Sequence, residues 1–247
     1  MSSDFLIVIP ARMGSRRLPG KPLRKLLGKT LIEWVFDAAR KITDNVVVAT
    51  DSDDIASVIR RAGGEAVITS SDHPSGTDRV AEAVKLVGGE FDYIVNVQGD
   101  EPFVEAEHLF PVVERLRGGD RFSTVATKFS SFEDVKNPAN VKVVLDRKGY
   151  ALYFSRSRIP FDRDGFSSPD NYLRHIGIYG FRKDALFEFV SWDVGFLEKT
   201  EKLEQLRILE HGEKIAVSIV KNLGVGVDTE EDIKIAEKLL KERLNGC

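Results

Sequence analysis

Residues 7–22 read IVIPARMGSRRLPGKP, an apolar run followed by a basic loop that contains glycine and proline. An apolar strand over Phe5–Ile9 runs into a glycine-containing loop with four cationic side chains, namely Arg12, Arg16, Arg17 and Lys21. Glycine lets a main chain approach phosphate oxygens closely, and Arg and Lys neutralise their charge. Because open α/β sheets bind ligands at the carboxyl ends of their strands, the stretch favours a polyphosphate site over a solvated basic turn.

The loop differs from two common phosphate-binding motifs. It is not a Walker A loop, because five residues rather than four separate Gly14 from Gly20-Lys21, and Pro22 stands where a magnesium-binding Ser or Thr is needed. The dinucleotide fingerprint G-x-G-x-x-G is also absent.

Length and charge limit the class of protein. The chain has 247 residues, which allows one large α/β domain or a main domain with a subdomain. A net charge of −3 gives no electrostatic footprint for nucleic acid or an anionic membrane. The single cysteine, Cys247, fits a reducing compartment, and Phe5–Ile9 is too short for a signal peptide or a membrane span. We therefore expect a cytoplasmic protein that binds neither nucleic acid nor a membrane.

Apolar periodicity predicts the order of the elements. Strand-like runs at 5–9, 45–49, 66–68 and 93–97 alternate with helix-like runs at 30–41, 53–62, 77–87 and 105–116. This rhythm predicts a doubly wound, mostly parallel sheet of the α/β class. From residue 121 the chain is β-rich, with strands expected at 122–129, 141–145, 151–154 and 176–181 and an exposed loop at 162–170. The remaining elements expected are helices at 183–190, 200–211 and 229–244, the last with Thr229 as N-cap, and a strand at 215–220.

Two aspartates follow strand-like or glycine-rich segments. Asp100 ends the run Asn96-Val97-Gln98-Gly99-Asp100, and a carboxylate there could hold Mg²⁺ or cap the next turn. Asp228 precedes an acidic helix start, so the residues alone favour a cap.

Three further motifs carry side chains suited to small-molecule binding. Ser75-Gly76-Thr77-Asp78-Arg79 offers short polar groups for a nucleobase or ribose, or else a capped helix start with a solvated Arg79. The segments 153–160 and 172–180 place cations beside aromatics, and residues 200–207 read TEKLEQLR. Taken alone, His175 reads as a structural histidine and Glu204 as part of a solvated helix face.

Asp51-Ser52-Asp53 follows a predicted strand, as the metal motif of a glycosyltransferase does. A helix start is favoured there, because Asp54 follows and the apolar helix pattern begins at Ile55.

In this order along the chain, from residue 7 to about residue 233, the motifs resemble those of the 3-deoxy-manno-octulosonate (Kdo) cytidylyltransferases, the CMP-Kdo synthetases, within the sugar nucleotidyltransferase family. The resemblance implies a Rossmann-like nucleotidyltransferase fold with a smaller β-rich dimerisation subdomain. We therefore predict a nucleotide-binding α/β core over 1–120 and 205–247, and a sugar-binding and dimerisation subdomain over 121–204.

The resemblance also implies the site residues. CTP binding falls to Ala11, Arg12, Gly14, Ser15, Lys21, Ser75, Gly76, Thr77, Arg79, Gln98 and Asp100. Sugar binding falls to Gln98, Arg158, His175, Tyr179, Glu204 and Gln205. The catalytic group comprises Arg12, Lys21, Asp100 and Asp228, and Mg²⁺ is the implied cofactor on the two aspartates.

The implied reaction joins CTP and Kdo to give CMP-Kdo and pyrophosphate, for lipopolysaccharide biosynthesis, in a homodimer. Three alternatives stay open. They are another sugar nucleotidyltransferase such as a CMP-sialate synthetase, a glycosyltransferase that uses Asp51 and Asp53, and a regulatory protein that binds CTP without turnover.

Overall fold

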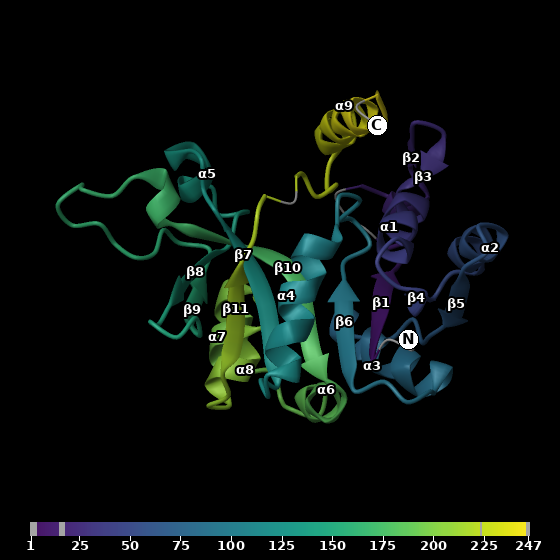
Figure 1. The fold of residues 1–247 in the computed structure, drawn as a ribbon, viewed down its shortest axis with the longest axis horizontal. Helices are drawn as coiled ribbons and strands as arrows, with labels where there is room; N and C mark the ends of the chain where they lie inside the picture. The colour runs from purple at the N-terminus through teal and green to yellow at the C-terminus, as the bar shows by residue number, and fades with distance from the viewer. Residues whose placement is uncertain (1–3, 15–17, 223, 246–247) are drawn as a thin grey trace. The chain divides into compact units, whose positions relative to one another are not determined.

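The computed structural model describes residues 4–14, 18–222 and 224–245. The chain divides into two units, Met1–Ala106 with Leu223–Cys247, and Glu107–Asn222. We call them the first and second unit, and Figure 1 labels the helices and strands of both.

The first unit contains a four-stranded parallel sheet in the order β6–β1–β4–β5. Its strands are β1 (Phe5–Ala11), β4 (Val46–Thr50), β5 (Glu65–Ile68) and β6 (Tyr93–Val97). Its helices are α1 (Leu31–Arg40), α2 (Asp53–Arg61), α3 (Gly76–Val87) and α9 (Glu230–Asn245), with the 3₁₀ turn η1 (Lys21–Leu23) and the hairpin strands β2 (Lys25–Leu26) and β3 (Lys29–Thr30). The α/β class and the parallel sheet are as the sequence predicts.

Strand order locates the functional edge of this sheet. The chain runs from β1 outward to β4 and β5, then returns to the other side of β1 as β6. With right-handed crossovers, α1 and α2 cover one face and α3 covers the other. The order of strands therefore reverses between β1 and β6, and the crevice at the carboxyl ends of such neighbours is where doubly wound sheets bind ligands.

Burial explains why these segments form strands and helices. Apart from Pro10, the apolar residues of β1 and β4 are at most 5% exposed, as expected for parallel strands covered on both faces. In α1 the buried residues recur at helical spacing, and Thr30 caps the helix through a reciprocal pair of bonds with Glu33. At the start of α9, Thr229 accepts a hydrogen bond from the Asp232 amide at 3.2 Å, which confirms its predicted capping role.

The second unit is mainly antiparallel. Its strands are β7 (Phe122–Lys128), β8 (Lys142–Leu145), β9 (Ala151–Ser155), β10 (Leu173–Arg182) and β11 (Ile215–Ile219). β10 pairs antiparallel with β7 and β8, β8 pairs antiparallel with β9, and β11 runs parallel to β7. The helices of this unit are α4 (Ala106–Arg117), α5 (Phe132–Lys136), α6 (Lys183–Phe189), α7 (Phe196–Glu201) and α8 (Leu206–Glu210), with the 3₁₀ turn η2 (Pro169–Asn171). The first residue of α4, Ala106, is the last residue of the first unit before Glu107.

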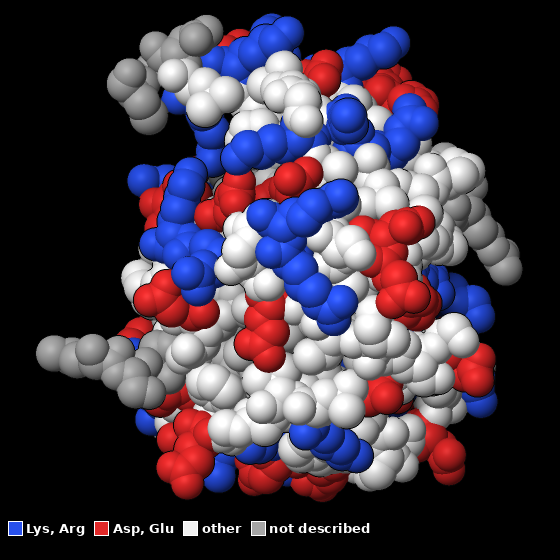
Figure 2. Space-filling view, turned by 90° about the vertical axis from the view of Figure 1, so that its right-hand side faces the viewer, with Lys and Arg blue, Asp and Glu red and all other residues white. Residues whose placement is uncertain are grey.

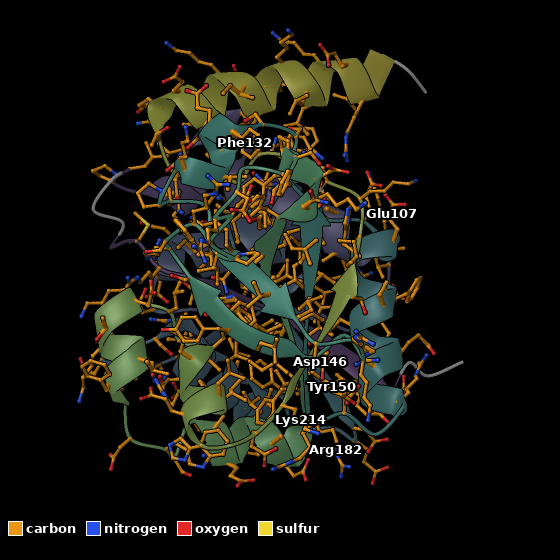
Figure 3. The ribbon with its side chains drawn as sticks, turned by 90° about the vertical axis from the view of Figure 1, so that its left-hand side faces the viewer. Glu107, Phe132, Asp146, Tyr150, Arg182 and Lys214 are labelled. Atoms are coloured by element: carbon orange, nitrogen blue, oxygen red, sulfur yellow. The ribbon has the colours of Figure 1, made fainter. Side chains whose placement is uncertain are left out.

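A charged side chain fixes the turn between β8 and β9. Asp146 accepts hydrogen bonds from the amides of Lys148 and Tyr150, each at 2.8 Å. The Lys214 ammonium lies over the Tyr150 ring, 5.4 Å from the ring centroid (Figure 3). These contacts order the turn in the way Asp commonly does, by bonding backbone amides that follow it.

The sequence prediction is wrong for residues 200–211. A single helix was expected there, whereas α7 ends at Glu201 and α8 begins at Leu206. Lys202 adopts the left-handed conformation with φ of 55°, which ends α7 and turns the chain. The short α5 and the β2–β3 hairpin were not predicted.

Gly180 of β10 offers a stability test within the second unit. A Cβ there would lie 2.3 Å from Val112 Cγ1 and 2.5 Å from Ser123 Oγ, both buried. We expect Gly180→Ala to lower the free energy of unfolding by about 1–3 kcal/mol through overpacking, measured by urea denaturation. Gly14→Ala is the matched control, because its Cβ would meet nothing within 4 Å. Equal stability of the two variants would contradict this packing.

The apolar character of the helices and the distribution of surface charge are two general properties of the structure. No helix in the described part of the chain is both long and apolar enough to span a bilayer. On the face drawn in Figure 2, basic and acidic side chains are interspersed rather than segregated.

Candidate active site

A cavity of about 690 Å³ opens at the carboxyl ends of β1 and β6 in the first unit. Its lining includes the predicted nucleotide-site residues Ala11, Arg12, Gly14, Lys21, Ser75, Gly76, Arg79, Gln98 and Asp100, together with Asp228. This volume lies in the range of small-molecule sites. Of the other predicted CTP-binding residues, Thr77 is buried in the first turn of α3, and Ser15 lies outside the described residues.

The basic loop is anchored where it rejoins the core. Leu18 is buried, and its carbonyl accepts a hydrogen bond from the Lys21 amide at 3.1 Å. Gly20 takes a φ of 66°, a left-handed conformation that glycine adopts without strain. The η1 turn then directs the Lys21 side chain into the cavity.

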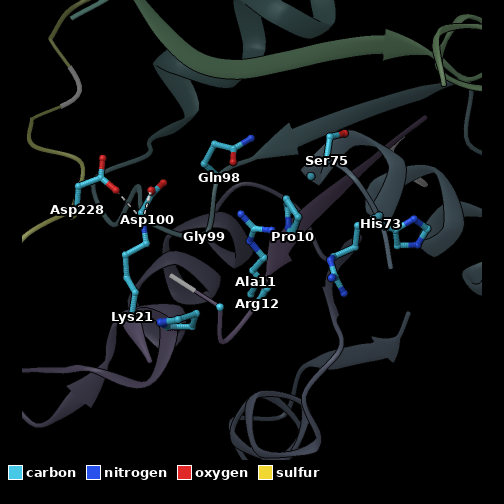
Figure 4. Close-up of a pocket in the computed structure, with 14 residues that line it drawn as sticks. Pro10, Ala11, Arg12, Lys21, His73, Ser75, Gln98, Gly99, Asp100 and Asp228 are labelled. Carbon is cyan, nitrogen blue, oxygen red and sulfur yellow. Dashed lines mark hydrogen bonds and ion pairs between the residues drawn. The ribbon is translucent and has the colours of Figure 1, made fainter. Parts of the chain in front are cut away.

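Lys21 is the centre of a charged triad (Figure 4). Its Nζ donates to Asp100 Oδ2 at 2.6 Å and to Asp228 Oδ1 at 2.9 Å. Burial alone lowers the pKa of Lys21, but the two carboxylates outweigh it, so the pKa is raised above its ordinary value. The ammonium therefore stays protonated in the physiological range.

The backbone brings the two aspartates together. The Val227 amide donates to the Asp100 carbonyl at 2.9 Å, and Val227 is fully buried. Thr229 and Asp232 bond one another at the start of α9, so the cap that the residues alone assigned to Asp228 is supplied by its neighbours. The Asp228 carboxylate is thereby directed to Lys21 instead.

The paired carboxylates fit a divalent cation. Among the residues described, no group of three or more His, Cys, Asp or Glu side chains is placed to hold a metal. Mg²⁺, however, is commonly bound by one or two carboxylates and completed by substrate phosphates and water. Oxygens of Asp100 and Asp228 already converge on one cationic group, the Lys21 ammonium. The donor set is therefore suitable for Mg²⁺ beside a triphosphate.

The far end of the cavity is formed by the start of α3. Ser75 caps this helix by accepting from the amides of Thr77 and Asp78, at 3.1 and 3.2 Å. A helix N-terminus attracts negative charge, and its first backbone amides can donate hydrogen bonds to a polar ligand. Figure 4 shows Ser75 and His73 at this end and Lys21 with its aspartates at the other.

Arg79 does not lie on a solvated helix face. It is 3% exposed, donates to Thr69 Oγ1 at 2.6 Å and pairs with Asp51 at 2.8 Å. Because Asp51 holds this arginine and Asp53 lies in the first turn of α2 after the cap Ser52, the helix-start reading of the Asp51-Ser52-Asp53 motif is confirmed.

Two lining residues had no role in the sequence interpretation. A Cβ at Gly99 would lie 2.9 Å from the Pro10 carbonyl oxygen, so glycine lets β1 and the β6 loop approach. His73 pairs through Nε2 with the Glu82 carboxylate, and this hydrogen bond holds the pKa of Glu82 below its ordinary value. The motif around Ser75 contains His73, but nothing in its spacing indicated the pairing with Glu82.

The second unit brings three of the predicted sugar-binding residues together. Tyr179 donates from its hydroxyl to Gln205 Oε1 at 3.0 Å, and its ring lies 5.3 Å from that of His175. Burial and the charge of Glu204 raise the pKa of Tyr179 well above its ordinary value. Glu204 lies between α7 and α8 rather than on a solvated helix face. Arg158 contacts a different group, donating to the Tyr172 hydroxyl at 2.6 and 2.9 Å.

His175 gives a pH test of this arrangement. Burial lowers its pKa to about 3, so the folded protein holds it neutral, whereas the unfolded chain protonates it near pH 6.5. The contribution of neutral His175 to the free energy of unfolding is present above pH 6.5 and is lost as the pH falls toward 3. Between pH 6.5 and 5.5 we expect the wild type to lose about 1 kcal/mol more unfolding free energy than His175→Gln, measured in urea. Parallel pH profiles for the two proteins would show that the folded protein protonates this ring freely.

The fold and cavity define an α/β protein with a ligand site at the carboxyl ends of its parallel strands, and comparison with known proteins narrows the class. The family model described as cytidylyltransferase matches residues 6–215. The chain belongs to the cytidylyltransferase family.

Solved structures agree with this assignment. A CMP:2-keto-3-deoxy-manno-octonic acid synthetase complexed with CTP is 36% identical, with 98% of this chain and 100% of that chain covered and a TM-score of 0.90. Two more distant structures share the fold. They are a 4-diphosphocytidyl-2C-methyl-D-erythritol synthase from Anaerococcus prevotii (15% identity, 97% and 100% covered, TM-score 0.64) and a cytidylyltransferase from Leptospira borgpetersenii serovar Hardjo-bovis (18%, 97% and 87%, TM-score 0.63).

Proposed function

We propose that this protein is a CMP-Kdo synthetase, which transfers the cytidylyl group of CTP to Kdo and releases pyrophosphate. The observation that carries the proposal is the convergence of Lys21, Asp100 and Asp228 at one end of a cavity whose other end is a helix N-terminus. The 36% identity to a synthetase of this name over 98% of the chain supports the choice of sugar.

The first unit binds CTP in this proposal. Arg12, Lys21 and the backbone around Gly14 neutralise and hold the triphosphate, while the start of α3 contacts the nucleoside. Short side chains at Ser75 and Gly76 leave room for a pyrimidine base at this end of the cavity. Arg79, which Asp51 already neutralises, orients this end rather than attracting the triphosphate.

The chemistry is an in-line displacement at the α-phosphorus. The anomeric 2-hydroxyl oxygen of Kdo forms a bond to this phosphorus, the bond to the β-phosphate bridging oxygen breaks, and the hydroxyl proton passes to solvent. Asp100 and Asp228 would hold a divalent cation, which would supply positive charge next to the phosphate oxygens. Lys21 orients and neutralises the departing pyrophosphate, because such transfers depend on positioning and charge stabilisation.

The second unit binds the sugar acid in this proposal. Arg158 offers a cation for the carboxylate, and His175, Tyr179, Glu204 and Gln205 offer hydrogen-bonding groups for the hydroxyls. Gln98, in the first unit, is also proposed as a sugar-binding residue, and its amide donates to Asn96 Oδ1 at 3.3 Å. The proposal keeps the predicted domains, with a nucleotide core over 1–120 and 205–247 and a sugar-binding and dimerisation segment over 121–204. It also includes Mg²⁺ as cofactor, a homodimer, a cytoplasmic location and a role in lipopolysaccharide biosynthesis.

Pyrophosphate release from CTP tests this function. We expect release with Kdo and Mg²⁺, little with sialic acid, none without sugar, and none after chelation with EDTA. Release that depends on sialic acid would favour a CMP-sialate synthetase. Binding of CTP without release for either sugar would favour a regulatory protein and would refute the synthetase proposal.

A further inference from the structure

A second charged cluster lies within the second unit, around the backbone of Arg156. We call Lys142, Arg156 and Glu201 the Arg156 cluster. Lys142 of β8 is fully buried, and its Nζ donates to the carbonyls of Asn137 at 3.2 Å, Asn140 at 2.7 Å and Arg156. An ammonium group has three protons, so all three are used on backbone oxygens. Burial, and then the charge of Arg156, lowers the pKa of Lys142.

Glu201, the last residue of α7, holds the same backbone from the other side. Its carboxylate accepts from the Arg156 amide at 2.9 Å and from Ser155 Oγ at 2.6 Å. The peptide groups on both sides of Arg156 are thus bonded to ionised side chains, the carbonyl to Lys142 and the amide to Glu201.

The Arg156 guanidinium extends these connections. Nε donates to the Glu201 carbonyl at 2.8 Å, and the two terminal nitrogens donate to the carbonyls of Pro138 and Lys202, at 3.1 and 3.4 Å. The end of β9, the loop after α5 and the end of α7 therefore meet at one residue. Hydrogen bonds to ionised groups are stronger than those between neutral groups, and several of them together fix the orientation of the bonded segments as well as their separation.

Both segments that leave this cluster lead to predicted sugar-binding residues. Arg158 is two residues beyond Arg156, and Gln205 follows the left-handed turn at Lys202. Gln205 in turn accepts from Tyr179. Burying a lysine is unfavourable compared with burying an apolar side chain of similar size. The compensation that Lys142 offers is a fixed position for the backbone carbonyls to which its ammonium is bonded.

We infer that Lys142, Arg156 and Glu201 are positioning residues, which set the two segments that carry Arg158 and Gln205 to receive an acidic sugar. The inference rests on the proposed function, and it assigns the cluster to sugar binding rather than to CTP binding. The ligand class is a sugar acid with one carboxylate and several hydroxyls.

Lys142→Met and Glu201→Gln test this role by complementary changes. Lys142→Met keeps an unbranched stem of nearly the same length and removes the ammonium. Glu201→Gln keeps the shape of the side chain and removes its charge. Lys214→Met is the matched control, because it is the same substitution in the same unit at an exposed lysine that packs on Tyr150. Circular dichroism and thermal unfolding verify that each variant is folded.

Calorimetric Kd values and steady-state KM values for Kdo and for CTP are the readouts. We expect both cluster variants to weaken Kdo binding by on the order of tenfold, with CTP binding within about twofold of wild type. The control should bind both as wild type does. If Lys142→Met fails to fold, Glu201→Gln carries the test alone. Unchanged Kdo binding in folded variants, or an equal loss for Kdo and CTP, would overturn the inference.

The two proposals fail in different ways. Wild-type protein that binds Kdo in the calorimeter but releases no pyrophosphate would refute the synthetase reaction, while the variant binding data would still decide the role of the cluster. Wild-type protein that binds no Kdo would refute both.

Discussion

Lys21→Ala should lower the rate of Kdo-dependent pyrophosphate release by a factor on the order of 10² or more. Lys21 is the cationic group to which both aspartates of the cavity are bonded, at 2.6 and 2.9 Å. In the proposed reaction it stabilises the charge that develops on the leaving pyrophosphate. The variant loses the positive charge next to the leaving pyrophosphate. It also leaves the carboxylates of Asp100 and Asp228 without their shared ammonium.

Lys29→Ala is the matched control for this substitution. Lys29 belongs to the same unit and is exposed, and it pairs with Asp37 at 2.7 Å, while its ammonium lies over Trp34. Its loss should leave turnover near the wild-type rate, because an exposed ion pair contributes little. Near-normal turnover of Lys21→Ala itself would rule out the phosphate-binding role of this residue.

Asp100→Asn should reduce metal-dependent turnover by on the order of 10³ while the protein stays folded. The amide is nearly isosteric with the carboxylate, and the Asp100 carbonyl still accepts from Val227. The variant keeps one carboxylate, on Asp228, which is a weaker site for a divalent cation.

Two readouts separate metal binding from turnover in this variant. Activity is titrated with Mg²⁺, and Mn²⁺ binding in the presence of CTP is followed by electron paramagnetic resonance. We expect weaker Mn²⁺ binding together with the lost activity. Asp37→Asn, which changes the partner of Lys29, should alter neither. Wild-type activity of Asp100→Asn across the Mg²⁺ titration would exclude it as a metal ligand.

Much of the first unit could be predicted from sequence because its signals are local. Strands such as β1 and β4 are continuous apolar runs, and the helices between them start at good caps such as Thr30 and Ser52. The break at Lys202 was missed because a lysine in the left-handed conformation has no sequence signature, whereas glycine at such a position would have one.

The candidate site was less predictable, because it depends on contacts between distant residues. Spacing alone made Asp228 a helix cap, and the Val227–Asp100 backbone bond that aims it at Lys21 is visible only in the fold. The predicted pairing of the two aspartates came from the family resemblance. The ion pair that buries Arg79 against Asp51 likewise joins two separate motifs.

Phosphorus NMR of one reaction mixture tests the central claim, cytidylyl transfer to Kdo, most directly. CTP, Kdo and Mg²⁺ are incubated with the protein, and parallel samples lack Kdo or contain EDTA. We predict that the three CTP signals give way to one phosphodiester signal, that of CMP-Kdo, and to pyrophosphate in equal amounts, in the complete mixture alone. CTP signals that persist in the complete mixture, or that give way to CMP or CDP without the phosphodiester, would contradict it.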